Sequence, residues 1–182
     1  EVCTAGVWCM ITRVQVGSYW SDTVTGTGFA DILNEMGGRF NDAVLVVDRA
    51  AGGLGVLSEL QLRWEYPQLY RMKEFGARPI WGGPMGWETH TRSMSTILAA
   101  LRADLALNTL RIADPRLVEE LMAFRFTEEV HTMVGPQPAA FAERVWAAAI
   151  ANWVMRAADE QVPEEKLDPF DMSRVGFFGY DK

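Results

Sequence analysis

Residues 43–57 read AVLVVDRAAGGLGVL, and the rest of the chain is best interpreted outward from this stretch. An apolar run leads directly into Asp48, and a small-residue, glycine-rich turn follows. Such a run is typical of a strand buried in the centre of a sheet. In open α/β sheets, ligands bind at the carboxyl ends of the strands, where Asp48 is expected to lie. Asp48 is therefore a candidate site residue, and capping of the following turn or helix is the alternative.

The flanking sequence predicts strands that alternate with helices. Residues 2–10 and 11–20 are rich in β-branched and aromatic side chains, which favours a pair of strands. Gly37-Gly38 predicts a helix stop. Strands alternating with helices indicate an α/β fold with a mixed central β-sheet flanked by helices. Apolar residues at helical spacing predict helices over 29–40, 54–64, 93–107, 115–124 and 139–157, with further extended segments at 77–83 and 110–114.

Composition limits the class of protein. The 182 residues are 49% hydrophobic and 23% charged, which is typical of one soluble globular domain. The net charge of −7 argues against a passive coat on nucleic acid. Cys3 and Cys9 are too far apart along a strand to form a disulfide, and free thiols fit a reducing cytosol. The longest apolar run, residues 145–155, is too short to span a bilayer.

Glu143 is a second candidate site residue. It is the only acid between Ala139 and Arg156, on the most apolar of the predicted helices. A local alternative is that it complements the helix dipole or pairs with Arg144. If the fold brings Asp48 and Glu143 together, their charges repel, and a divalent cation such as Mg²⁺ or Mn²⁺ relieves that repulsion.

Several other kinds of site are excluded or disfavoured because the sequence lacks their motifs. The chain has no G-x-x-x-x-G-K-[ST] phosphate-binding loop, and its glycine-rich stretch lacks the G-x-G-x-x-G spacing of a dinucleotide site. His90 and His131 have no Cys or His at zinc-ligand spacing. No serine lies in a G-x-S-x-G turn.

Four segments together resemble a known family. Residues 29–57 hold a helix, N-x-A and a strand that ends in an acid, and residues 69–101 hold LY, GW-x-T and a helix. Residues 110–126 contain L-x-I-x-D and EL-x-x-F, and residues 141–151 contain V-x-A-x-x-I-A. In this order and spacing, from about Phe29 to Met155, they resemble the nuclease domain of tailed-phage terminase large subunits. That domain is the RNase H-like nuclease of a DNA-packaging motor.

The resemblance implies an RNase H-like fold over residues 1–160, followed by a C-terminal tail over 161–182. It places Asp48 and Glu143 at two of the catalytic, metal-binding acidic positions, with Asp48 in place of a Glu and Glu143 in place of an Asp. The first catalytic Asp of the family lies on the opening strand of the sheet, which is expected upstream of Glu1. Glu1 corresponds to an auxiliary acid that some members carry. The implied cofactor is Mg²⁺ or Mn²⁺.

The implied function is cleavage of concatemeric double-stranded DNA during packaging in the host cell cytoplasm. The implied partners are double-stranded DNA, the terminase ATPase domain and small subunit, and the portal protein, with no membrane. Arg49, Arg92 and Arg144 are candidate contacts to DNA phosphates, and ordinary surface charge is the alternative for each.

Departures from the family motifs leave other functions open. Ala50-Ala51 stand where the family usually has two Asn, and Phe141-Ala142 replace the His and first Asp of its third motif. One alternative is therefore a catalytically weak or inactive module that docks the motor on the portal or on DNA. Another is a different RNase H-like nuclease, such as a junction resolvase, which the GW-x-T and EL-x-x-F segments disfavour.

Overall fold

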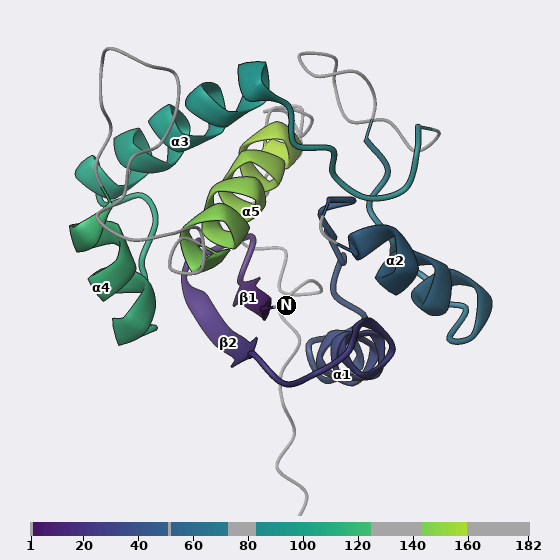
Figure 1. Ribbon diagram of the computed structural model, residues 1–182. Coiled ribbons are helices and arrows are strands. Elements are labelled where there is room, and N and C mark those ends of the chain that lie inside the picture. Colours follow the sequence, from purple (N-terminus) through teal and green to yellow (C-terminus); the bar gives the residue numbers. More distant parts are fainter. Residues whose placement is uncertain (1, 51, 73–82, 125–142, 160–182) are drawn as a thin grey trace, which may run out of the picture.

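The computed structural model describes residues 2–50, 52–72, 83–124 and 143–159, which form a mixed α/β fold (Figure 1). The expected α/β class is thereby confirmed, whereas the regular sheet among the described residues has two antiparallel strands, and the mixed central sheet stays a prediction. Of the predicted features, the tail over 161–182 and most of the short strand over 77–83 lie outside the described residues. The elements are β1 (Cys3–Trp8), β2 (Gln15–Ser21), α1 (Gly26–Arg39), α2 (Gly53–Leu62), α3 (Thr91–Ala106), α4 (Pro115–Ala123) and α5 (Glu143–Asp159).

The first two elements form the predicted strand pair. β1 and β2 are antiparallel, with Cys3 opposite Ser21, and the register shifts between Val7 and Trp8. Val14, just before β2, forms an isolated parallel bridge with Arg111 in the extended segment ahead of α4. The hairpin at the amino-terminal end of the described chain therefore pairs with the segment that leads into α4.

The stretch 43–48 is extended, but it is not the regular central strand that the apolar run predicts. It forms isolated parallel bridges, Leu45 with Leu69 and Asp48 with Trp87. Val47 is buried, and the other residues of the stretch are half-buried. The prediction of a central strand is not met among the described residues, because the backbone bonds run through Leu45, Val47 and Arg49 and so lie on one edge of the stretch. Both of its faces are nevertheless packed, as predicted.

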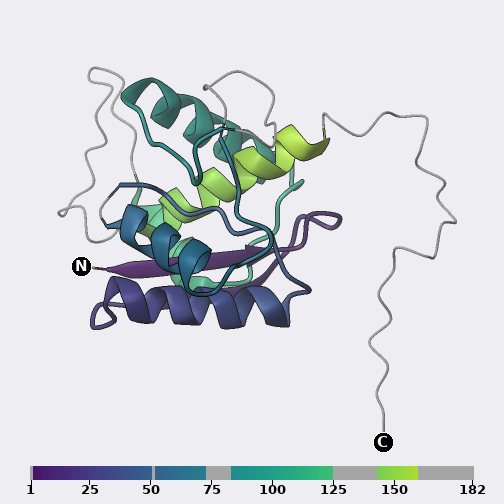
Figure 2. The ribbon, with the colours of Figure 1, turned by 90° about the vertical axis from the view of Figure 1, so that its right-hand side faces the viewer.

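Two hydrophobic clusters lie on opposite sides of the hairpin and the extended stretch. Figure 2 shows α3 and α5 above the hairpin and α1 below it. Val46 packs with the cluster built on α3, α4 and α5, whereas Leu45 and Val47 pack with the cluster built on α1 and α2. Because alternate residues of an extended chain point to opposite faces, Asp48 is expected to face the same side as Val46, toward α5.

The helices begin at residues that stabilise a helix start. The Thr25 side chain accepts a hydrogen bond from the Gly28 amide ahead of α1. Asp114 caps α4 in the same way. Pro115 occupies the first turn, where a backbone N–H would have no partner within the helix, so its absence costs little. Every residue of α5 from Glu143 to Ala158 is buried or half-buried, as its nearly continuous apolar surface predicts.

Candidate functional site

The carboxylate of Asp48 lies at the end of the extended stretch and is held by two donors. The Thr89 hydroxyl donates to Oδ2 at 2.7 Å, and the Ala50 amide donates to Oδ1 at 3.1 Å. The backbone around it is also anchored, since the Arg49 amide donates to the carbonyl of Trp87 at 2.8 Å. The carboxylate therefore has a defined orientation even though it is only half-buried.

Two glycines allow the chain to pass close to Asp48. A Cβ on Gly53, at the start of α2, would overlap the carbonyl oxygen of Asp48. Gly86 has φ +81°, and a Cβ there would lie 2.7 Å from the carbonyl oxygen of Val47. Gly53 of the glycine-rich turn and Gly86 of GW-x-T thus both allow close packing around the end of this stretch.

Glu143 is the first residue of α5, and its surroundings disfavour its charged form. Burial raises the pKa of Glu143, and the neighbouring charges of Glu120 on α4 and then Asp48 raise it further. Glu143 and Asp48 are therefore close enough in space for one charge to act on the other. The structure thus places the two acids that the sequence predicted as site residues within range of each other's charge.

The chemistry of this acidic pair fits a divalent cation. Both side chains offer carboxylate oxygens, the ligand type that Mg²⁺ and Mn²⁺ prefer. A cation between them would offset the repulsion that raises the pKa of Glu143. Within the part of the chain that the structure describes, no group of three or more His, Cys, Asp and Glu side chains could hold a metal ion. The described residues thus supply two carboxylates, and Glu1 lies outside them.

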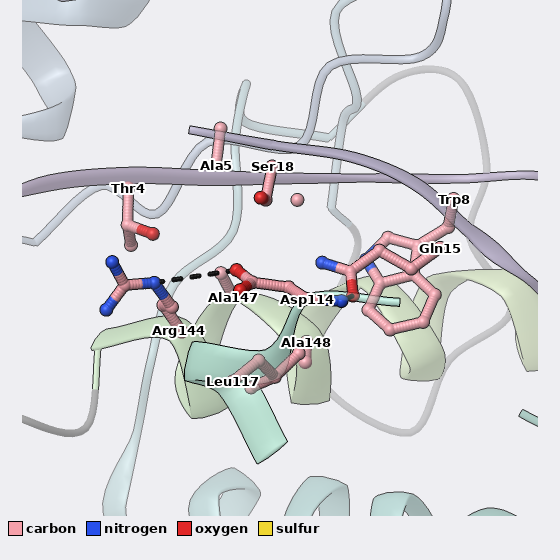
Figure 3. A pocket seen from close by; sticks show the side chains of 11 residues that line it. Thr4, Ala5, Trp8, Gln15, Ser18, Asp114, Leu117, Arg144, Ala147 and Ala148 are labelled. Atoms are coloured by element: carbon pink, nitrogen blue, oxygen red, sulfur yellow. Dashed lines mark hydrogen bonds and ion pairs between the residues drawn. The ribbon is translucent and has the colours of Figure 1, made fainter. Parts of the chain in front are cut away.

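Arg144 lies in an internal cluster of ion pairs. Its guanidinium pairs with Glu120 at 2.5 Å and with Asp114 at 3.6 Å, and it lies over the Trp20 ring at 5.3 Å. Its side chain is 12% exposed. Figure 3 shows Arg144 and Asp114 pointing toward each other across a small pocket between the hairpin and α4–α5, beside Thr4 of β1. Arg144 thus joins α5 to α4 and β2.

The other predicted phosphate contacts differ in what the structure describes. Arg49 is partly exposed and pairs with Glu88 at 3.1 Å, and His90 lies 3.9 Å from the other oxygen of Glu88. The side chain of Arg92 lies outside the described residues, although its backbone belongs to α3. Arg49 is thus the predicted phosphate contact whose described side chain reaches the surface near Asp48.

Sequence reasoning missed two residues of this region. Thr89 holds Asp48, and Glu120 both raises the pKa of Glu143 and binds Arg144. Thr89 is the last residue of the GW-x-T segment, so a signal for it was present in the sequence. Glu120 is the first residue of the EL-x-x-F segment, so the sequence held a signal for it as well, but the spacing did not indicate its partners.

No helix among the described residues combines the length and the apolar character needed to cross a membrane. No protein-family model matches the chain, and no curated protein matches its sequence.

Proposed function

We propose that this chain is an RNase H-like, metal-dependent endonuclease domain of the kind found in terminase large subunits. The observation that carries the proposal is the placement of Asp48, which is held by Thr89 and Ala50 at the end of its stretch, within range of the charge of Glu143 at the start of α5. Burial, then the charge of Glu120 and then that of Asp48 raise the pKa of Glu143. In α/β folds, ligand sites are expected at the ends of extended segments, and acids with shifted pKa values are often found at such sites.

The arrangement of extended segments supports an RNase H-like sheet with a further strand. Along one edge of stretch 43–48, backbone groups of Leu45, Val47 and Arg49 form hydrogen bonds with neighbouring segments. The backbone groups of Val44, Val46 and Asp48 therefore point to the opposite edge. β1 is paired with β2 along one of its own edges. In an RNase H-like sheet, one more strand would lie between these two edges and join them into a single mixed sheet.

The direction of the chain is consistent with such a strand. Figure 3 shows Arg144, near the start of α5, on the side of Thr4 near the start of β1 and away from Trp8 at its end, while Asp48 at the end of its stretch acts on Glu143. The start of β1 and the end of stretch 43–48 therefore lie near the same end of α5, so the two run in opposite directions. A strand antiparallel to β1 would run parallel to stretch 43–48 and end near both acids.

Asp48 and Glu143 would hold Mg²⁺ or Mn²⁺, together with the Asp expected on that upstream strand. When bound, the cation supplies activation of water and stabilisation of the leaving 3′ oxygen. The protein contributes a carboxylate fixed by Thr89 and Ala50, and a glutamate whose pKa is raised by burial and by the charges of Glu120 and Asp48. Arg49, at the surface beside this site, is the phosphate contact that best fits the geometry.

The same proposal extends to partners and place of action. The substrate would be concatemeric double-stranded DNA, and the domain would act with the terminase ATPase domain, the small subunit and the portal protein in the host cell cytoplasm. The acidic balance of the chain, net −7, fits an enzyme that binds DNA through cations and a few arginines rather than through a broad basic surface.

A nicking assay on supercoiled DNA with Mn²⁺ tests the proposal. We expect cleavage by protein that includes the upstream strand, loss of cleavage in Asp48→Asn and in Glu143→Gln, and unchanged cleavage in Asp22→Asn. Asp22 is an exposed acid in the loop after β2 and serves as the matched control. A folded protein that includes the strand but does not cut would contradict the proposal and favour the docking module instead.

A further inference from the structure

We propose that Thr89 is the positioning residue of the acidic site, and that it acts through Asp48. Its hydroxyl fixes one oxygen of the Asp48 carboxylate and thereby sets how that acid presents its remaining lone pairs to a cation. This inference rests on the proposed function, and it adds a residue whose removal weakens metal binding without removing a ligand.

The two hydrogen bonds to Asp48 differ in kind. The bond from the Ala50 amide is local, spans two residues and is the sort that Asp makes in many turns. The bond from Thr89 is shorter, at 2.7 Å, and joins residues that are 41 positions apart. Because the donors hold different oxygens, the local bond keeps the side chain near its turn and the Thr89 bond sets the rotation of the carboxylate.

Thr89 can do this because the backbone on both sides of it is fixed. The Trp87 amide donates to the Val47 carbonyl at 2.8 Å, and the Trp87 side chain is only 1% exposed. On the other side, His90 caps α3, where its amide donates to the Ser93 hydroxyl at 3.0 Å. Thr89 therefore lies between a backbone pairing with the Asp48 stretch and a capped helix start.

The chemistry of the contact leaves Asp48 able to bind a cation. An ionised carboxylate has about four acceptor positions, and the two hydrogen bonds use only two of them. Hydrogen bonds from outer groups to metal-binding carboxylates orient the ligand, and their loss typically weakens metal affinity about 10- to 100-fold. Thr89 fits that pattern, since it has no charge and its hydroxyl already faces Asp48.

Calorimetric titration of the chain with Mn²⁺ alone tests this role. We expect Thr89→Val to weaken the affinity about 10-fold and Thr89→Ser, which keeps the hydroxyl, to restore it. In an Asp48→Asn background, Thr89→Val should cause no additional loss, because the two residues act as one unit. Thr23→Val, which removes an exposed threonine hydroxyl in the loop after β2, is the matched control and should bind Mn²⁺ as the parent does.

Thermal unfolding of each variant separates a lost fold from a lost site. If Thr89→Val does not fold, the comparison is made between Thr89→Ser and Thr89→Ala. The inference is overturned if removal of the hydroxyl leaves the affinity unchanged, or if the loss is equally large in the Asp48→Asn background. A parent chain that binds no Mn²⁺ overturns this inference, while the nicking assay tests the proposed function separately, and normal binding by folded Thr89→Val also overturns this inference alone.

Discussion

Asn152, in the middle of α5, donates a 2.8 Å hydrogen bond to Oδ2 of Asp104 on α3. Both residues are buried, and the same carboxylate accepts from Arg156 at 3.1 Å and from Thr109 at 3.0 Å. Arg13, beside the hairpin, lies 3.4 Å from it. This buried polar cluster thus connects α5 to α3 and the hairpin, and it fixes the helix that carries the candidate site.

Asp104→Ala is expected to destabilise the protein by about 2–4 kcal/mol, because buried partners lose their acceptor. Burial alone would raise the pKa of Asp104, but hydrogen bonds from Asn152, Thr109 and Arg156 outweigh it and lower the pKa. The carboxylate therefore contributes stability above its ordinary pKa of 3.8, and this contribution is lost as pH falls through the lowered value. Urea unfolding at pH 7 and pH 3 should show a large difference between parent and variant at pH 7 and a smaller one at pH 3. A difference that does not change with pH would contradict this account.

Glu143→Gln is expected to stabilise the cation-free protein at neutral pH. The raised pKa of Glu143 means that the folded state holds a proton more tightly than the unfolded state. Its contribution is fully present below the ordinary pKa of 4.5 and is lost as pH rises through the raised value, so the ionised glutamate is a penalty at pH 7. Thermal unfolding from pH 4 to pH 8 should show a gain for the variant at high pH only. Glu119→Gln, at an exposed position on α4, should show no such pattern.

Gly37→Ala and Gly38→Ala are expected to have opposite effects. The sequence predicted a helix stop at these two glycines, and α1 ends one residue after them, at Arg39. A Cβ on Gly37 would overlap the ring and hydroxyl of Tyr66, so this change should cost about 1–3 kcal/mol. A Cβ on Gly38 meets open space, and alanine there should stabilise the helix by about 0.5–1 kcal/mol. Equal changes in the free energy of unfolding by urea would show that the packing of Tyr66 does not require the absence of a side chain at Gly37.

Arg144→Ala is expected to lower stability by about 2–4 kcal/mol, because Asp114 and Glu120 would lose their shared partner in a largely buried position. The matched control is Arg116→Ala, an exposed arginine on α4, which should change stability by less than about 0.5 kcal/mol. Guanidinium unfolding of both variants measures the difference. A small effect at Arg144 would instead favour the phosphate contact that the sequence suggested.

Arg49→Ala is expected to weaken DNA binding with little effect on folding. The Arg49 side chain is 29% exposed and pairs with the more exposed Glu88, so the ion pair contributes little to stability. Loss of one phosphate contact should reduce the salt dependence of DNA affinity by about one unit of log–log slope. Arg39→Ala, an exposed arginine paired with Glu35 on α1, is the control. The prediction fails if both variants change the slope equally.

The sequence alone predicted the features that depend on neighbouring residues. The hairpin, the five described helices and the start of α4 at Pro115 follow from β-branched runs, apolar periodicity and capping residues, all of which act over a few positions. It also identified Asp48 and Glu143 as unusual, since each is an acid in apolar surroundings. Stretch 43–48 was the exception, because an apolar run shows that a segment is buried but not which segments pair with it.

Only the tertiary structure decided which distant groups meet. Thr89 donates a hydrogen bond to Asp48, and the charges of Glu120 and Asp48 raise the pKa of Glu143. Arg144 lies in an internal ion-pair cluster. Such contacts depend on how layers pack and on where each segment ends, and no local spacing encodes these distances. The physical reason is that charge–charge effects and hydrogen bonds act through space, so their partners are set by the fold and not by separation along the chain.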